Sequence, residues 1–93
     1  MEVQHKTEKQ KGLFSIEEDQ QFVAELAYSL QADDHLVIHH TEVNSEYRGQ
    51  DIGEQLVYKA VDYARENNYK IIPTCPFARA IIEKDENLKD VLG

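Results

Sequence analysis

Leu36–Asn68 reads LVIHHTEVNSEYRGQDIGEQLVYKAVDYARENN, and within this stretch the sequence changes from a strand pattern to a helix pattern. The part from Leu36 to Val43 is rich in β-branched residues and predicts a strand that stops at turn formers. From Ile52 onward the apolar residues recur at the spacing of one helix face. The predicted helix face contains Ile52, Leu56, Val57, Ala60, Val61 and Ala64.

A glycine-bearing run, Arg48-Gly49-Gln50-Asp51-Ile52-Gly53, joins the predicted strand to the predicted helix. A turn of this kind can leave several backbone N–H groups free at the helix N-terminus, where the helix dipole also favours negative charge. The run therefore predicts a phosphate-binding turn, and Arg48 can add a charge-assisted contact. The alternative is a plain connector whose glycines serve only the turn, because short glycine motifs often match by chance.

The same run resembles the Arg/Gln-x-x-Gly-x-Gly/Ala signature with which the GNAT superfamily of acetyl-CoA-dependent N-acetyltransferases binds the coenzyme pyrophosphate. Its first and last residues match, whereas Asp51 stands at the first motif glycine. His-His-Thr-Glu-Val precedes the run and Cys75-Pro76-Phe77-Ala78 follows it. With these flanks the chain is similar to the minimal, cysteine-containing GNAT-like proteins of roughly one hundred residues. The resemblance covers nearly the whole sequence.

The resemblance implies an α/β (α+β) domain with a mixed, mostly antiparallel sheet, a central strand–phosphate loop–helix unit and a shorter C-terminal helix. It implies acetyl-CoA or coenzyme A as the ligand and acetyl transfer to an amine acceptor as the activity. It also implies that Cys75 lies near the thioester, where it would accept the acetyl group or form a mixed disulfide with coenzyme A. The implied coenzyme-binding residues are Val43, Arg48, Gly49, Gln50, Asp51, Ile52, Gly53 and Glu54.

Two side chains are candidates for chemistry on their own residue types. Cys75 precedes Pro76, which favours the first position of a helix, and a thiol at a helix N-terminus has a lowered pKa. The alternative for Cys75 is a small buried apolar residue. Strict strand alternation gives His40 the same face as Leu36 and Ile38, and a histidine there can take a proton at neutral pH. The alternative for His40 is a half-buried, hydrogen-bonded side chain.

We expect no metal site. Under the same alternation His39 and His40 point to opposite faces, so they cannot chelate one ion together. The other histidines, His5 and His35, add no ligand spacing.

The remaining elements follow from local patterns. Residues 1–10 fit an edge strand or a loose end. The segment Phe22–Leu30 fits a strand or an amphipathic helix equally well by period, and the GNAT resemblance favours the strand. Lys70–Ile72 predicts a strand limited by Pro73 and parallel to the Leu36 strand, and a helix follows from Pro76 to about Lys84. On the long helix, Asp62 and Arg65 are at pairing distance.

Composition limits the classes of function. Ninety-three residues predict one domain, residues 1–93. A net charge of −8 disfavours nucleic-acid binding and favours a cationic amine or a basic partner. One cysteine and no long apolar run predict a cytoplasmic protein without a membrane segment. We further expect a monomer or a weak homodimer.

Two functional hypotheses stay open at this point, beside the possibility of a small structural domain that keeps only the fold. The first is an acetyl-CoA-dependent N-acetyltransferase acting on an unknown amine or protein acceptor, directly or through Cys75. The second is a non-catalytic coenzyme A-binding or protein-interaction module. The chain is shorter than full-length GNAT proteins, so we expect an open acceptor side, which favours the second hypothesis.

Overall fold

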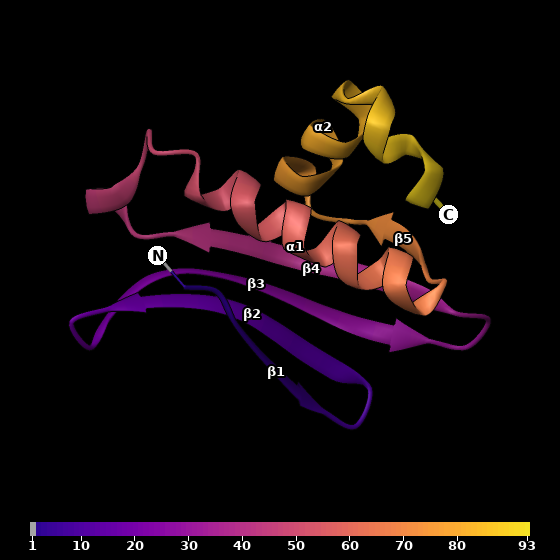
Figure 1. The fold of residues 1–93 in the computed structure, drawn as a ribbon, viewed down its shortest axis with the longest axis horizontal. Helices are drawn as coiled ribbons and strands as arrows, with labels where there is room; N and C mark the ends of the chain where they lie inside the picture. Colours follow the sequence, from indigo (N-terminus) through magenta and orange to yellow (C-terminus); the bar gives the residue numbers. More distant parts are fainter. Residues whose placement is uncertain (1) are drawn as a thin grey trace.

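A computed structural model describes residues 2–93, and only Met1 of the N-terminal segment lies outside the described residues. Five strands form one sheet in the order β1-β2-β3-β4-β5 (Figure 1). The first four strands are antiparallel and β5 is parallel to β4, which confirms the predicted mixed, mostly antiparallel sheet. The elements are β1 (Gln4–Glu8), β2 (Lys11–Glu18), β3 (Gln21–Gln31), β4 (His35–Val43), the 3-10 helix η1 (Ser45–Tyr47), α1 (Ile52–Asn67), β5 (Lys70–Pro73), α2 (Pro76–Lys84) and the 3-10 helix η2 (Glu86–Val91).

Two ambiguous segments are strands. The N-terminal segment supplies the edge strand β1, and Phe22–Leu30 lies within β3, between β2 and β4. Alternate residues of β3, including Leu26 and Tyr28, are buried toward the core, as a strand with one covered face requires. The helical stripe in the same segment is therefore a coincidence of spacing.

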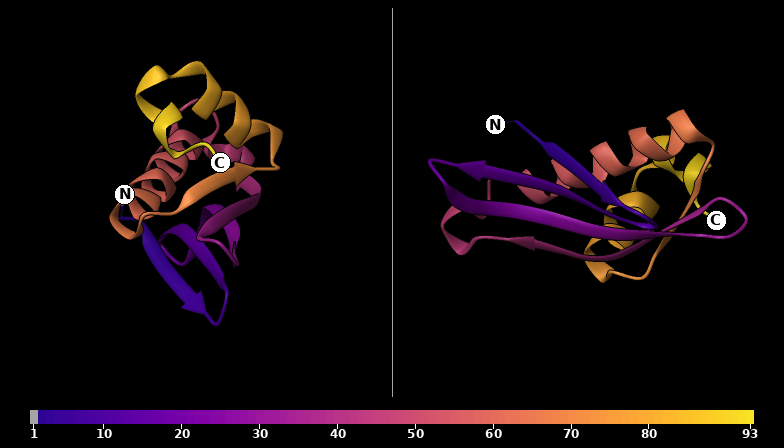
Figure 2. Two further views of the ribbon diagram at one scale, coloured as in Figure 1. Left: turned by 90° about the vertical axis from the view of Figure 1, so that its right-hand side faces the viewer. Right: turned by 90° about the horizontal axis from the view of Figure 1, so that it is seen from below.

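Helix α1 covers one face of the sheet and contacts β2, β3, β4 and β5. Figure 2 shows this layer, and no helix among residues 2–93 covers the opposite face of β2 and β3. The apolar positions predicted for the helix face are all buried. Each fully buried aliphatic side chain contributes about 1.5 to 3 kcal/mol, so this stripe holds α1 to the sheet. No helix in the described part of the chain is long and apolar enough to cross a membrane.

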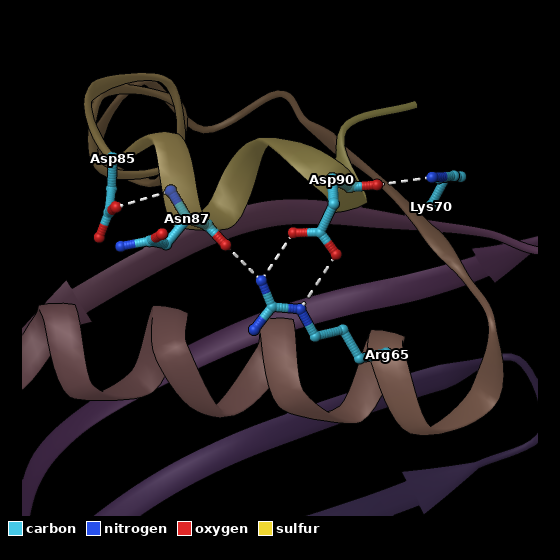
Figure 3. A network of polar contacts seen from close by, with 5 residues as sticks. All are labelled: Arg65, Lys70, Asp85, Asn87 and Asp90. Atoms are coloured by element: carbon cyan, nitrogen blue, oxygen red, sulfur yellow. Dashed lines mark hydrogen bonds and ion pairs between the residues drawn. The ribbon is translucent and has the colours of Figure 1, made fainter.

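An ion-pair network ties η2 to α1 and β5 (Figure 3). Arg65 donates to both carboxylate oxygens of Asp90, at 2.6 and 3.1 Å, and also to the carbonyl of Asn87. The hydrogen bonds from Arg65 lower the pKa of Asp90. Lys70 Nζ donates to the Asp90 carbonyl at 2.5 Å. The predicted pairing of Arg65 with Asp62 is thus wrong, because a residue 25 positions away offers a bidentate partner.

Strand β4 carries a β-bulge at His39. Ile38 lies opposite Tyr28 of β3 and His40 lies opposite the preceding Ala27, so His39 has no partner in the ladder. One extra residue reverses the side to which every later side chain points. Beyond the bulge, Thr41 therefore shares the α1 side of the sheet with its partner Leu26.

Strands β4 and β5 pair only along their first halves. Their parallel ladder runs from His35 opposite Lys70 to Ile38 opposite Pro73. The Thr74 amide and hydroxyl then donate to the Ile38 carbonyl at 3.2 and 2.7 Å, and the chain turns into α2. Residues 39–43 consequently have no strand partner on the β5 side within residues 2–93, which leaves that edge of β4 open.

Candidate functional site

A cleft of about 470 Å³ lies where the open end of β4 meets the N-terminus of α1. Its volume is within the range of small-molecule and cofactor sites. The lining comes from β4, η1, the turn before α1, the first turn of α1 and the start of α2. The lining residues are Thr41, Glu42, Val43, Tyr47, Arg48, Gly49, Asp51, Ile52, Gly53, Glu54 and Phe77.

Three backbone N–H groups at the start of α1 are free. The first helical hydrogen bond is donated by Gln55 to the carbonyl of Asp51, at 3.1 Å. The amides of Ile52, Gly53 and Glu54 precede it, and none of them donates to another group of residues 2–93. The side chain of Asp51, the N-cap residue, makes no capping hydrogen bond. The free amides and the helix dipole together provide a site for an anion.

The turn before α1 adopts a left-handed backbone at two positions. Gly49 has φ of 86°, and Asp51 has φ of 58° and ψ of 25°. Asp51 therefore adopts the conformation that the family's motif glycine usually supplies, because aspartate tolerates this region better than most residues. The departure from the glycine signature leaves the turn geometry intact and adds a carboxylate to the cleft.

Gly53 allows a close approach between α1 and α2. A Cβ atom at this position would lie 2.7 Å from Cζ of Phe77 and 3.3 Å from Cγ2 of Val43. The absence of a side chain lets the Phe77 ring, which is 43% exposed, form one wall of the cleft. The Phe77 ring thus occupies the place that a side chain at residue 53 would take.

The charges around the cleft are mostly negative. Arg48 is the one basic lining residue in the described part of the chain, against the acidic Glu42, Asp51 and Glu54. Arg48 is exposed, so it can reach a bound anion at the rim. An anionic ligand must therefore depend on directed backbone donors more than on the local net charge.

Cys75 is the N-cap of α2 and lies behind the cleft. It is 7% exposed, is absent from the lining, and has its sulfur 3.8 Å from Oγ1 of Thr41, a lining residue. Burial raises the pKa of Cys75, but hydrogen bonds from the Ala78 amide, the Thr41 hydroxyl and the Phe77 amide outweigh burial and lower it overall. The Cys75 thiol therefore loses its proton more readily than an ordinary cysteine does.

His40 lies on the sheet face opposite α1. Its Nε2 is 3.1 Å from Oε2 of Glu25, and it lies opposite Ala27, which follows the core-facing Leu26. The expectation that His40 shares the face of Ile38 is therefore wrong, because the bulge at His39 interrupts strict alternation. His40 is also not part of the cleft lining.

Most of the predicted coenzyme-binding residues meet in this one cleft. Val43, Arg48, Gly49, Asp51, Ile52, Gly53 and Glu54 all line it, whereas Gln50 does not. The pattern-based reasoning missed Thr41, Glu42, Tyr47 and Phe77. For Phe77, the only sequence signal of a position in the cleft was its place next to the Cys75-Pro76 helix start. Tyr47 had no such signal.

Comparisons with known proteins show the family and the fold of this chain. A family profile described as GCN5-related N-acetyl-transferase matches residues 13–91. A GCN5-like protein from Staphylococcus aureus, solved in solution, is 33% identical, with 97% of this chain and 87% of that chain covered and a TM-score of 0.73. The chain belongs to the GCN5-related N-acetyltransferase family. No curated protein sequence matches it.

Other GCN5-related N-acetyltransferases share the fold at lower identity. The ribosomal-protein-alanine N-acetyltransferase of Brucella melitensis biovar Abortus 2308 is 17% identical, with a TM-score of 0.70 over 83% of this chain and 62% of that chain. A Bacillus anthracis acetyltransferase of the streptothricin type, solved with acetyl coenzyme A, is 18% identical, with a TM-score of 0.61 over 71% of this chain and 38% of that chain. The chain thus spans less than two thirds of these two larger relatives.

Proposed function

We propose that this protein binds acetyl-CoA in the cleft and transfers the acetyl group to an amine acceptor. The observation that carries the proposal is the set of three free amides, from Ile52, Gly53 and Glu54, at the N-terminus of a 16-residue helix. Such amides suit a pyrophosphate, and exposed Arg48 can add a charge-assisted contact. The structure of the Bacillus anthracis relative with acetyl coenzyme A supports the same ligand.

The open edge of β4 suits the rest of the coenzyme. Residues 39–43 have backbone groups on the β5 side that no strand of residues 2–93 pairs, and Val43 lines the cleft. The amide groups of a pantetheine arm can pair with such an edge in the manner of an added strand. The coenzyme would then run from the phosphate site to Thr41, and its thioester end would lie beside Cys75.

Acetyl-CoA supplies an activated thioester carbonyl. The chain therefore has to orient that carbonyl and provide an acceptor for the proton that the amine loses. In direct transfer an amine attacks the carbonyl carbon, the coenzyme thiolate leaves, and the amine loses a proton. His40, hydrogen-bonded to Glu25, can accept that proton only from an acceptor that enters from the open face of the sheet.

Cys75 offers a second route through a covalent intermediate. Its thiolate would attack the carbonyl carbon, and the coenzyme would leave as a thiolate that takes up a proton. An amine would then attack the acetylated Cys75, lose a proton and regenerate the cysteine. The lowered pKa of Cys75 supports this route, and its burial behind Thr41 means that access requires local movement.

A non-catalytic coenzyme A-binding module is the alternative function. Two observations favour it: the carboxylates of Glu42, Asp51 and Glu54 at the cleft, and the burial of the Cys75 thiol. Neither function identifies the acceptor. The net charge of −8 favours a cationic amine or a basic protein segment as the partner.

Calorimetry with coenzyme A, acetyl-CoA and pantetheine tests the binding site. Coenzyme A should bind with one site per chain, and pantetheine, which lacks the pyrophosphate, should bind at least tenfold more weakly. Equal binding of both ligands, or no binding of either, would refute the phosphate site.

Intact-mass measurement after incubation with acetyl-CoA then separates the routes. An acetyl adduct in the wild type that is absent in Cys75→Ala supports the covalent route. Transfer to polyamines or basic peptides without an adduct supports the direct route. Binding with neither adduct nor transfer supports the module.

A further inference from the structure

Three potential metal ligands meet on the sheet face opposite α1. One nitrogen of His40 and one carboxylate oxygen each of Glu25 and Glu42 all lie within 4.8 Å of one another. We propose that these residues, the β-face triad, bind a divalent transition metal ion such as Zn²⁺. The triad shares Glu42 with the lining of the proposed coenzyme cleft, but its ligand atoms do not include any of the free α1 amides.

The bulge in β4 creates the triad. In a regular strand, with His39 paired in the ladder, alternation would turn His40 toward the core side that Ile38 occupies, away from Glu25. With it, His40 and Glu42 lie two residues apart on one strand face, and Glu25 lies directly opposite Glu42 on β3. Bulges commonly re-aim a side chain in this way next to functional sites.

The ladder positions two carboxylates where a cation is needed. Glu25 and Glu42 form a directly opposed cross-strand pair, and like charges in such a pair destabilise a sheet. His40 lies on the same face, with its Nε2 3.1 Å from Oε2 of Glu25. A divalent cation would neutralise both carboxylates at once and would use the neutral imidazole nitrogen as a ligand.

The donor set and spacing select the class of metal. One imidazole nitrogen with two carboxylate oxygens suits Zn²⁺, Co²⁺, Ni²⁺ or Cu²⁺, whereas Mg²⁺ and Ca²⁺ prefer oxygen alone. Ligands about 2.0 to 2.1 Å from a tetrahedral ion lie roughly 3.3 Å apart, close to the 3.1 Å between His40 and Glu25. Glu42 is exposed and can rotate to close the third contact. The fourth position is left for water or another ligand.

The neighbouring histidine is not a fourth ligand. His39 Nε2 lies 2.7 Å from Oγ of Ser29, farther along the sheet from Glu25. The expectation of no metal site rested on His39 and His40 pointing to opposite faces and on the lack of ligand spacing at His5 and His35. Its first premise is wrong, because the bulge brings both His39 and His40 to the face opposite α1. The ligands come instead from two different strands, which no sequence spacing could reveal.

Cobalt absorption and zinc calorimetry on tag-free protein test the triad. Co²⁺ should give visible absorption bands saturating at one equivalent, and Zn²⁺ should displace it. His40→Ala and Glu42→Gln should each weaken binding at least tenfold. His39→Ala, the adjacent residue outside the triad, and Cys75→Ser, which removes the only thiol, should bind as the wild type does.

An amide NMR spectrum of each variant verifies its fold, and the exposed Glu42→Gln substitution guards against a misfolded His40→Ala. Absence of binding up to about 1 mM metal would overturn the proposal. Unchanged affinity in both triad variants, or loss of binding in Cys75→Ser, would do the same, because the metal would then lie elsewhere.

Discussion

The carboxylate of Asp51 should weaken coenzyme binding, and its removal should strengthen it. Asp51 immediately precedes the free amides of α1, lines the cleft and has an exposed side chain. Asp51→Gly restores the glycine of the family signature. Asp51→Asn removes the charge alone and keeps a residue that tolerates the left-handed backbone observed at φ 58°.

Coulomb's law gives the size of the expected effect. A carboxylate about 6 Å from a phosphate charge at an effective dielectric of about 20 costs roughly 2.8 kcal/mol. Screening over a Debye length of about 8 Å at physiological salt reduces this to about 1.3 kcal/mol, or roughly tenfold in affinity. At about 1 M salt the Debye length falls to about 3 Å, and the gain should fall to about twofold.

Calorimetry with coenzyme A at low and high salt measures this effect. Both Asp51 variants should bind about tenfold more tightly than the wild type at physiological salt. Asp62→Asn, an exposed charge on α1 outside the cleft, should change the affinity less than twofold. Unchanged or weaker binding by both Asp51 variants would refute the placement of the phosphate, and a gain that is independent of salt would refute its electrostatic cause.

Three further predictions concern stability and the thiol. Gly12→Ala would place a Cβ 2.0 Å from Cζ of Tyr28 and should lower the free energy of unfolding by about 1 to 3 kcal/mol; an unchanged thermal midpoint would contradict this packing. Burial lowers the pKa of His5, so its stabilising contribution is present above about pH 6.5 and is lost as pH falls through that value toward the folded-state pKa. Urea unfolding at pH 7.5 and 5.5 should therefore show that the free energy of unfolding falls more for the wild type than for His5→Gln. Equal decreases in the two proteins would contradict this role of His5. The alkylation rate of Cys75 should reach half its maximum at a lower pH than that of an ordinary thiol, and Thr41→Val should raise this midpoint pH. An unchanged midpoint in Thr41→Val would show that the Thr41 hydroxyl does not lower the pKa of Cys75.

Local patterns were sufficient where neighbours in sequence are also neighbours in space. The four-residue spacing from Ile52 located α1, whose end is set by the left-handed Asn68. Pro73 and Pro76 marked the end of β5 and the start of α2, because a proline restricts its own backbone and that of the residue before it. The glycine run, whose residues are neighbours in sequence, likewise located five of the eleven residues that line the cleft.

Features that depend on partners far along the chain were not predictable in this way. The bulge at His39 is a property of the β3–β4 ladder, so strict alternation assigned His40 to the wrong face. Asp90 reaches Arg65 only after β5 and α2 have turned the chain back. Phe77 enters the cleft because Gly53, 24 positions earlier, leaves room for its ring. The period of Phe22–Leu30 fitted two structures; the family resemblance favoured the strand, and pairing on both sides provides the physical reason.

Amide NMR titration with coenzyme A tests the central claim, that main-chain nitrogens at the start of α1 bind the pyrophosphate. The account predicts that the amides of Ile52, Gly53 and Glu54 show the largest chemical-shift changes, and that pantetheine alone leaves them nearly unchanged. Shifts confined to other parts of the chain, or saturation of these amides by pantetheine as well as by coenzyme A, would contradict it.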